Sequence, residues 1–366
     1  MAFSKVIIDQ FRGIRHCDID SLGKRVNLFV GKNNCGKTSV LDAIFMLSGI
    51  SNPYLFYSIN SFRECGFTDF EGVSSINFYN LDFNKPINIQ GLDLTSKEKR
   101  NLVIRPLWGE IFEIADSNGV LSTQSKQKLN RIIYEFEIES KSSRKEYINI
   151  LEEHNDSDDP ETHARAGNIT TKDGNTAIYD EKYKGSYLGS KSIFSFPIKD
   201  LSSIIKDKKK NIILSSLQEI EPRIKDIAII QFRVYVDVGI DKMVPIEVLG
   251  DGIRRLLSII VYLYKCQGGN LFIDEIDNGL HHSSMSTLWQ TILSTAEQFN
   301  VQLYATTHNI DSLKALKNVL EEDQNIHFQK ETMCYRLRKA EDDNLIAYKY
   351  DFEKFEYAIT AEHEIR

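Results

Sequence analysis

The stretch of sequence that decides the fold is Gly31-Lys32-Asn33-Asn34-Cys35-Gly36-Lys37-Thr38, which matches the pattern G-x-x-x-x-G-K-[ST]. The glycines of this pattern let backbone N–H groups wrap around an anion, and the following helix adds its positive N-terminal end. Lys37 is expected to reach the β- and γ-phosphates of a nucleotide, and the Thr38 hydroxyl to bind Mg²⁺. The pattern therefore predicts a phosphate-binding loop formed by Gly31, Lys32, Asn33, Asn34, Cys35, Gly36, Lys37, Thr38 and the adjacent Ser39.

The segments on both sides of this loop have the pattern that a phosphate-binding loop requires. The apolar run from Val26 to Val30 ends directly at Gly31, as a buried core strand would. Between Lys37 and Leu47 the apolar residues recur at the spacing of one helix face. The chain therefore reads here as strand, loop and helix, preceded by a short apolar strand at Val6–Ile8.

Regular alternation of strands and helices returns after residue 230. A half-buried strand runs from Phe232 to Val238, and a helix is expected from Ile253 to about Cys266. Further elements are a buried strand at Leu271–Ile273, a helix from about Ser283 to Phe299 and a strand at Val301–Thr306. This order predicts a parallel sheet with helices on its faces.

Charged and polar side chains follow two of these predicted strands. A carboxylate at the end of a buried strand, here Asp274, is of the kind that holds Mg²⁺, and Thr38 would share the ion. The next carboxylate, Glu275, would accept a proton from the attacking water, and His308 would sense the γ-phosphate. We therefore predict Lys37, Glu275 and His308 as catalytic residues, and Thr38 and Asp274 as metal ligands.

A second glycine-rich turn, Leu249-Gly250-Asp251-Gly252, precedes the helix that contains Arg254 and Arg255. Two glycines before a helix form another N-terminus that favours anions. Because Lys37 already serves one phosphate site, Gly250, Asp251 and Gly252 are expected to complete the site of a second molecule. The tight turn Asn278–His281 would lie against a partner in the same way.

Composition and charge narrow the class of protein further. The chain has 366 residues, and its 45 basic and 52 acidic side chains give a net charge of −7. A protein that binds duplex DNA by general electrostatics is expected to be basic, so the net charge does not support nucleic acid as a partner, although a local patch stays open. The five cysteines form no C-x-x-C pair, and neither a signal peptide nor a membrane span is evident, so a cytoplasmic protein is expected.

These motifs resemble those of ABC-type ATPase heads of the SMC, RecF and OLD (overcoming lysogenization defect) group, and especially the stand-alone AAA family ATPases related to OLD. Those proteins have G-x-N-N-x-G-K-[ST], D-E-x-x-N-G-L-H and A-T-T-H, which are here Gly31–Thr38, Asp274–His281 and Ala305–His308. The opening Asp9-Gln10-Phe11-Arg12-Gly13 is similar to their N-F-R-G start. The resemblance covers about residues 1–50 and 228–315.

The resemblance implies one ABC-type head over residues 1–366 that binds ATP and Mg²⁺ and hydrolyses the ATP. Its α/β fold would have a mostly parallel core sheet, an N-terminal antiparallel β subdomain and an inserted α/β middle region. The core lobes would span about 1–54 and 228–366, and the middle region about 55–227, with a flexible loop at about 152–191. The signature L-S-G-G-Q of these heads is absent, with Leu249–Gly252 in its place, and Gln90 is a candidate for the Q-loop glutamine.

The implied function is that of a sensor or regulatory ATPase that pairs head to head with a second copy around ATP. It would control a separate effector chain such as a nuclease, because the short strands after His308 are too little for the Toprim nuclease domain that is fused to OLD proteins. No heptads for SMC arms occur, so a long-range DNA tether is not expected. The chain is similar in this respect to ATPase subunits of anti-phage systems such as Septu and PARIS. The alternatives are a RecF-like DNA-repair ATPase, an ATP-dependent scaffold with little turnover, and a transporter subunit, which the Asn33-Asn34 pair disfavours.

Overall fold

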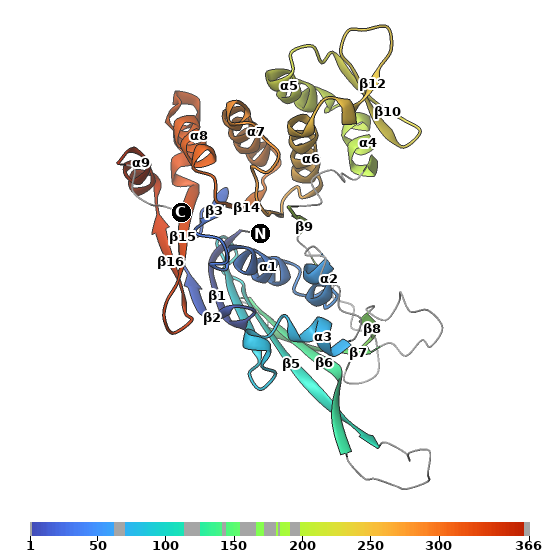
Figure 1. Cartoon of the computed structure of the whole chain (residues 1–366), viewed down its shortest axis with the longest axis vertical. Coiled ribbons are helices and arrows are strands. Elements are labelled where there is room, and N and C mark those ends of the chain that lie inside the picture. The colour runs from blue at the N-terminus through green and yellow to red at the C-terminus, as the bar shows by residue number, and fades with distance from the viewer. Residues whose placement is uncertain are drawn as a thin grey trace.

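Two large β-sheets, with helices on and between them, form the molecule (Figure 1). The computed structural model describes residues 2–61, 70–112, 125–140, 144–153, 166–171, 181, 184–190 and 198–361. One sheet is mostly parallel and the other is antiparallel, which confirms the expected α/β fold. The predicted flexible loop at 152–191 lies mostly outside the described residues.

The parallel sheet carries the predicted phosphate loop. In order across the sheet its strands are β16 (Leu345–Tyr350), β15 (Thr332–Lys339), β3 (Val26–Val30), β14 (Gln302–Thr307), β13 (Asn270–Ile273) and β9 (Gly185–Leu188). Only β16 runs antiparallel among these six. Strands β3, β13 and β14 are buried at every position, because layers cover both faces of the sheet. The middle of the chain supplies β9, while the proposed division into core lobes stays a prediction.

The antiparallel sheet combines the N-terminus with the middle of the chain. Its order is β2 (Ile14–Ile19), β1 (Phe3–Phe11), β4 (Ile87–Asp93), β5 (Lys99–Phe112), β6 (Ser125–Glu139), β7 (Arg144–Glu153) and β8 (Ala166–Thr171). Sequence reasoning found β1 but missed β2, whose apolar residues are interrupted by Arg15, His16 and Asp18. The short helices α2 (Leu55–Ser61) and α3 (Phe70–Ser75) lie beside this sheet (Figure 1).

Helix α1 (Lys37–Ser48) lies between the two sheets (Figure 1). It is buried on nearly all sides, as expected for a helix with sheets on both faces. Its side chains belong to a core cluster that also includes Phe3 of β1 and Phe272 of β13. The loop before α1 is therefore held at a fixed place at the carboxyl end of β3.

A layer of helices covers the other face of the parallel sheet (Figure 1). It consists of α6 (Asp251–Lys265), α7 (Met285–Gln298), α8 (Ile310–Glu321) and α9 (Phe352–Thr360). Helices α4 (Ile198–Lys206) and α5 (Lys210–Ile220) pack against α6 and lie next to a small sheet of β10 (Asp226–Ile230), β11 (Arg233–Asp237) and β12 (Val244–Pro245).

The prediction that Phe232 begins a half-buried strand was wrong. Gln231 and Phe232 form the two-residue turn between β10 and β11, and their φ angles are 48° and 62°. Positive φ at both central residues is what a tight hairpin turn of this hand requires. The turn leaves the Phe232 ring 86% exposed, whereas Val234 and Val236 are buried as expected.

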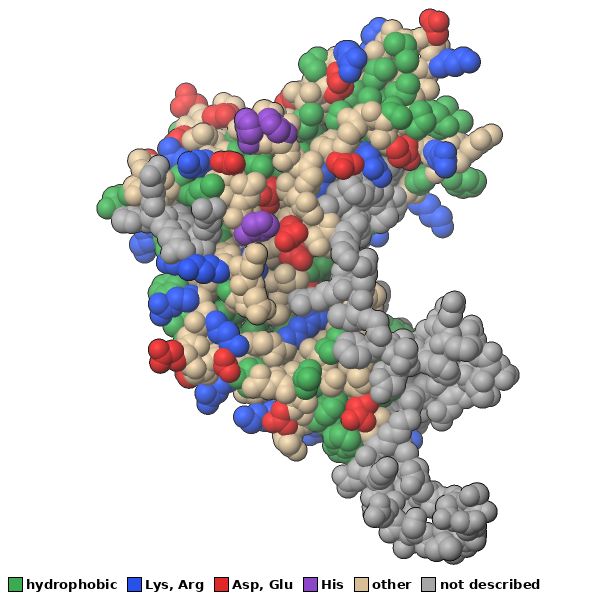
Figure 2. All heavy atoms as spheres, viewed as in Figure 1, with side chains coloured by type: hydrophobic (Ala, Val, Ile, Leu, Met, Phe, Trp, Pro, Cys, Tyr) green, Lys and Arg blue, Asp and Glu red, His purple; other side chains and the backbone are tan. Residues whose placement is uncertain are grey.

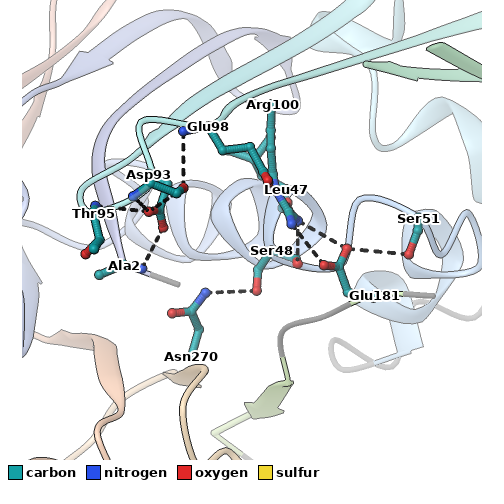
Figure 3. Close-up of polar contacts among 11 residues, drawn as sticks. Ala2, Leu47, Ser48, Ser51, Asp93, Thr95, Glu98, Arg100, Glu181 and Asn270 are labelled. Atoms are coloured by element: carbon teal, nitrogen blue, oxygen red, sulfur yellow. Dashed lines mark hydrogen bonds and ion pairs between the residues drawn. The ribbon is translucent and has the colours of Figure 1, made fainter. Parts of the chain in front are cut away.

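Arg100 of β5 ties the antiparallel sheet to the C-terminus of α1 (Figure 3). Its fully buried guanidinium donates to the carbonyls of Leu47 and Ser48, at 3.3 and 3.1 Å. The carboxylates of Glu98 and Glu181 pair with it at 3.0 and 2.9 Å. A cation at the negative end of a helix dipole is stabilised there.

We expect Arg100→Met to lower the free energy of unfolding by about 3–5 kcal/mol, because it leaves two largely buried carboxylates without their cation. Chemical denaturation monitored by circular dichroism measures this loss. Arg105→Met is the matched control in the same strand, since its half-exposed side chain pairs with Glu135 at the surface. The control should change the stability by less than about 1 kcal/mol. Equal losses for the two variants would contradict a structural role of Arg100.

Candidate functional site

The loop Gly31–Thr38 has the backbone that a phosphate loop needs. Gly31 and Gly36 have φ angles of 148° and 100°, and Asn34 has a φ of 62°. A Cβ atom at Gly31 would lie 2.6 Å from the carbonyl oxygen of Leu337 and 2.7 Å from Cys35 Sγ. Only glycine fits at this position, so the loop can fold tightly against β15.

Lys37 and the first turn of α1 are arranged for an anion. Lys37 Nζ donates to the carbonyl oxygens of Gly31 and Lys32 at 2.8 and 2.9 Å, so the ammonium group lies over the loop. No side chain caps the N-terminus of α1 at Gly36, and its first turn holds no acidic residue. The first turn therefore leaves its positive end to a bound group.

The two predicted metal ligands lie together. Thr38 Oγ1 donates to Asp274 Oδ1 and Oδ2 at 3.2 and 3.3 Å. On the other side of the carboxylate, Thr306 Oγ1 donates to Asp274 Oδ1 at 2.6 Å. These residues come from α1, from the end of β13 and from β14, so the sheet itself brings them to one point.

Mg²⁺ prefers oxygen ligands and is usually bound by one or two carboxylates together with substrate phosphates and water. The hydroxyl of Thr38 and the carboxylate of Asp274 fit this donor set. Among the described residues, no three His, Cys, Asp or Glu side chains form a metal-binding group by themselves. A divalent ion bound at Asp274 would therefore take its other ligands from the phosphates of a nucleotide.

Glu275 and His308 face each other at the same edge of the sheet. Glu275 Oε1 lies 3.9 Å from His308 Nδ1, and the two side chains are 41% and 54% exposed. The backbone of Glu275 has a φ of 50°, and its N–H donates to Thr306 Oγ1 at 2.8 Å. Figure 2 shows acidic and histidine side chains side by side near the middle of this face, with basic side chains below them.

A hollow of about 580 Å³ lies beside the phosphate loop. Its lining includes Asn34, Cys35, Gly36 and Ser39 together with the apolar residues Ile76, Phe78 and Leu81. Its size is in the range of small-ligand pockets, and its apolar and polar walls suit a nucleoside. Ser39 therefore faces this hollow rather than the Thr38–Asp274 pair.

Arg12, also in the wall of the hollow, was not predicted as a site residue. Its guanidinium forms an ion pair with Asp42 of α1 and donates to Asn60 Oδ1 at 2.7 Å. Thr306 was missed in the same way, although both residues lie within quoted motifs, the F-R-G start and A-T-T-H. Only their place in those motifs could have indicated a role for Arg12 and Thr306 from the sequence.

The second glycine turn lies at the N-terminus of α6, next to the turn 278–281. Gly250 has a φ of 89°, and Asp251 begins α6 with its side chain 58% exposed. Cβ of Asp251 lies 3.7 Å from the place of a Cβ at Gly279, and the place of a Cβ at Gly252 is 3.2 Å from Leu280. The turns 249–252 and 278–281 therefore form one largely exposed ridge.

Gln90 lies in β4 and lines a different hollow, of about 270 Å³, with Lys5 and Lys99. No hydrogen bond joins Gln90 to the Thr38–Asp274 pair within the described part of the chain. Its assignment as a Q-loop glutamine therefore gains no support from its position.

Residues 26–313 match the family described as "AAA domain, putative AbiEii toxin, Type IV TA system". The chain belongs to this family. The matched range of this AAA-domain family includes the phosphate loop, Asp274, Glu275 and His308.

The chain is also similar to individual proteins and to solved structures. An ATP/GTP phosphatase of Helicobacter pylori is 23% identical over 98% of both chains. A DNA replication and repair protein RecF of Vibrio campbellii is 53% identical over 47 residues, which are 13% of each chain. Among solved structures, an SMC head bound to the C-winged helix domain of ScpA is similar over 97% of this chain, with a TM-score of 0.51 and 11% identity. The fold is therefore that of an SMC-type head.

No helix in the described part of the chain has both the length and the apolar character needed to cross a membrane.

Proposed function

We propose that this chain is an ATPase that hydrolyses ATP to ADP and phosphate at the site built by the phosphate loop, Asp274, Glu275 and His308. The observation that supports this most is the convergence on Asp274. Thr38 from the helix after the loop and Thr306 from the neighbouring strand both donate to its carboxylate. Glu275, the next residue, would be the proton acceptor for water.

The roles of the residues follow from their chemistry. Backbone N–H groups of the loop and Lys37 would hold the β- and γ-phosphates and offset their charge. Thr38 and Asp274 would hold Mg²⁺, which supplies charge stabilisation for phosphoryl transfer. Glu275 would accept a proton from the water whose oxygen bonds to the γ-phosphorus, while the bond to the β-phosphate oxygen breaks. His308, 3.9 Å from Glu275, would orient that water.

The exposure of the site supports a composite arrangement with a second copy. Glu275, His308 and Asp251 are 41%, 54% and 58% exposed, so water is not excluded by the chain alone. A partner's ridge at 249–252 and 278–281 would cover ATP and complete the site, as water exclusion strengthens electrostatic interactions. ATP would thus close two heads on each other.

We further propose that closure of the heads controls a separate effector, such as a nuclease, in anti-phage defence of the OLD, Septu or PARIS kind. The family description, "AAA domain, putative AbiEii toxin, Type IV TA system", supports a second component. The SMC head similar in fold to this chain binds a winged-helix domain of another protein. Co-purification from the native host, and phage resistance of cells with wild type or Lys37→Ala, test this part. Unchanged resistance in the variant and no partner protein would contradict it.

Phosphate release from ATP and from GTP tests the chemical proposal directly. We expect release of phosphate with Mg²⁺ and its loss when EDTA removes the ion, because Asp274 and Thr38 would then face the phosphates without the cation between them. GTP is included because the relative from Helicobacter pylori is named for both nucleotides. Full activity in EDTA would contradict the assignment of Asp274.

A RecF-like role in DNA repair is the second candidate, and the local match to RecF of Vibrio campbellii favours it. Its distinguishing result is stimulation of hydrolysis by DNA. Indifference to single- and double-stranded DNA would leave the regulatory ATPase as the better account.

A further inference from the structure

Two neighbouring arginines at the start of α6 have opposite environments. Arg254 lies partly exposed and pairs with Asp251 at 3.3 Å. Arg255 is fully buried, one turn after the exposed ridge residue Asp251. An arginine buried inside a helix layer is costly unless its donors are used, so its partners indicate its role.

The partners of Arg255 are three consecutive backbone carbonyls. Its Nη2 donates to the carbonyl oxygens of Glu275 and Asp274 at 2.8 and 3.3 Å, and its Nε to that of Ile276 at 3.4 Å. Nη1 is buried and has no hydrogen-bond partner among the described residues. The guanidinium therefore spans the turn that carries the predicted metal ligand and the predicted base.

This turn needs such support because its backbone is strained. Glu275 has a φ of 50°, which is uncommon for a residue with a Cβ atom, and such conformations persist only where the surroundings fix them. Thr306 holds the turn from the sheet side, through the N–H of Glu275 and the carboxylate of Asp274. Arg255 holds it from the helix side.

The Arg255 side chain stays charged although it is buried. Burial lowers the pKa of Arg255 to about 10, against the attraction of Asp277, Asp274 and Glu275. The group is therefore still protonated at neutral pH and keeps all of its donors.

We propose that Arg255 is the positioning residue that sets the direction of the Glu275 carboxylate, and that it links this carboxylate to the ridge at the start of α6. A shift of α6 on contact with a partner would move the guanidinium and, with it, the Asp274–Ile276 turn. Helix α6 would therefore contact the partner's site through Gly250–Gly252 and position the base of its own site through Arg255. This inference rests on the proposed ATPase function.

The test is a kinetic double-mutant cycle with Arg255→Lys and Glu275→Gln. Lysine keeps the charge but cannot span three carbonyls, so kcat for ATP should fall by about 10-fold or more, while KM and the Kd of ATP change less than about twofold. In the Glu275→Gln background, Arg255→Lys should have no further effect, because the carboxylate that it positions is gone.

Arg25→Lys is the matched control. Arg25 is also buried and donates to two carbonyl oxygens, those of Ala296 and Val301 at 2.7 and 3.2 Å, but it lies at the amino end of β3. This control should lower the stability and leave kcat within about twofold. If Arg255→Lys does not fold, Arg255→Gln replaces it in the same cycle.

Three outcomes distinguish a failure of the positioning role of Arg255 from a failure of the proposed ATPase function. An unchanged kcat in Arg255→Lys, or an equal fold-loss in both backgrounds, would overturn the positioning role while the ATPase proposal stands. A loss of kcat in Arg25→Lys as large as in Arg255→Lys would mean that general destabilisation is the cause, and would also overturn it. No phosphate release by the wild type at any protein concentration would overturn the proposed function itself, and this inference with it.

Discussion

Glu275→Gln is expected to lower kcat for ATP by about 10³-fold and to leave ATP bound as tightly as in the wild type. Glutamine has the same shape but cannot accept a proton from the attacking water, and general-base catalysis contributes 10²–10⁴-fold. The phosphate loop and the Asp274–Thr38 pair are unchanged, so the binding groups stay in place. Single-turnover hydrolysis and equilibrium binding of a fluorescent ATP analogue measure the two effects separately.

Glu297→Gln is the matched control for this prediction. Glu297 also faces a histidine, His327, at 3.2 Å, but at the surface and away from the phosphate loop. It should keep wild-type kcat and binding. Residual turnover of Glu275→Gln near the wild-type level would mean that another group takes the proton.

Lys37→Ala is expected to raise the Kd of ATP by about 100-fold or more and to abolish turnover with it. The ammonium group lies within 3 Å of two loop carbonyls, where it can turn to a phosphate instead. Charge-assisted hydrogen bonds are worth about 1.5–3 kcal/mol each, and one such bond lost without replacement already changes Kd by about 10–100-fold. The same binding assay gives the result.

The fold should survive this change, because the carbonyls of Gly31 and Lys32 can bond to water. We expect the free energy of unfolding to fall by only about 1–2 kcal/mol. Lys317→Ala, which removes a surface ion pair with Glu321 in α8, is the remote control and should bind ATP normally. Binding by Lys37→Ala at wild-type affinity would contradict the role of this loop.

Sequence reasoning predicted the parts of the fold where local pattern and tertiary structure agree. The strands β3, β13 and β14 are short apolar runs that end at polar residues, and burial on both faces explains that pattern. Sequence reasoning failed at β2, which is an exposed edge strand, and at Phe232, which lies in a hairpin turn. Helices α8 and α9 were also missed, since no glycine or proline marks their ends.

At the site, the motifs predicted the acidic and basic residues but not the side chains that position these residues by hydrogen bonds. Structure places Thr38 with Asp274 and Glu275 with His308, as the assignments require, although their roles stay predictions. Thr306, Arg12 and Arg255 act through hydrogen bonds to residues up to 65 positions away in the sequence. Such contacts depend on the packing of strands, which no local pattern reports.

The most direct test of the account is the specific ATPase activity measured over a wide range of protein concentration, for wild type and Glu275→Gln. Because Gly250–Gly252 of one head would complete the site of another, we predict that activity per molecule rises with concentration and then reaches a plateau. Glu275→Gln should show no such rise. Activity that is constant over the whole range, at a level that one isolated chain sustains, would contradict a site shared by two heads.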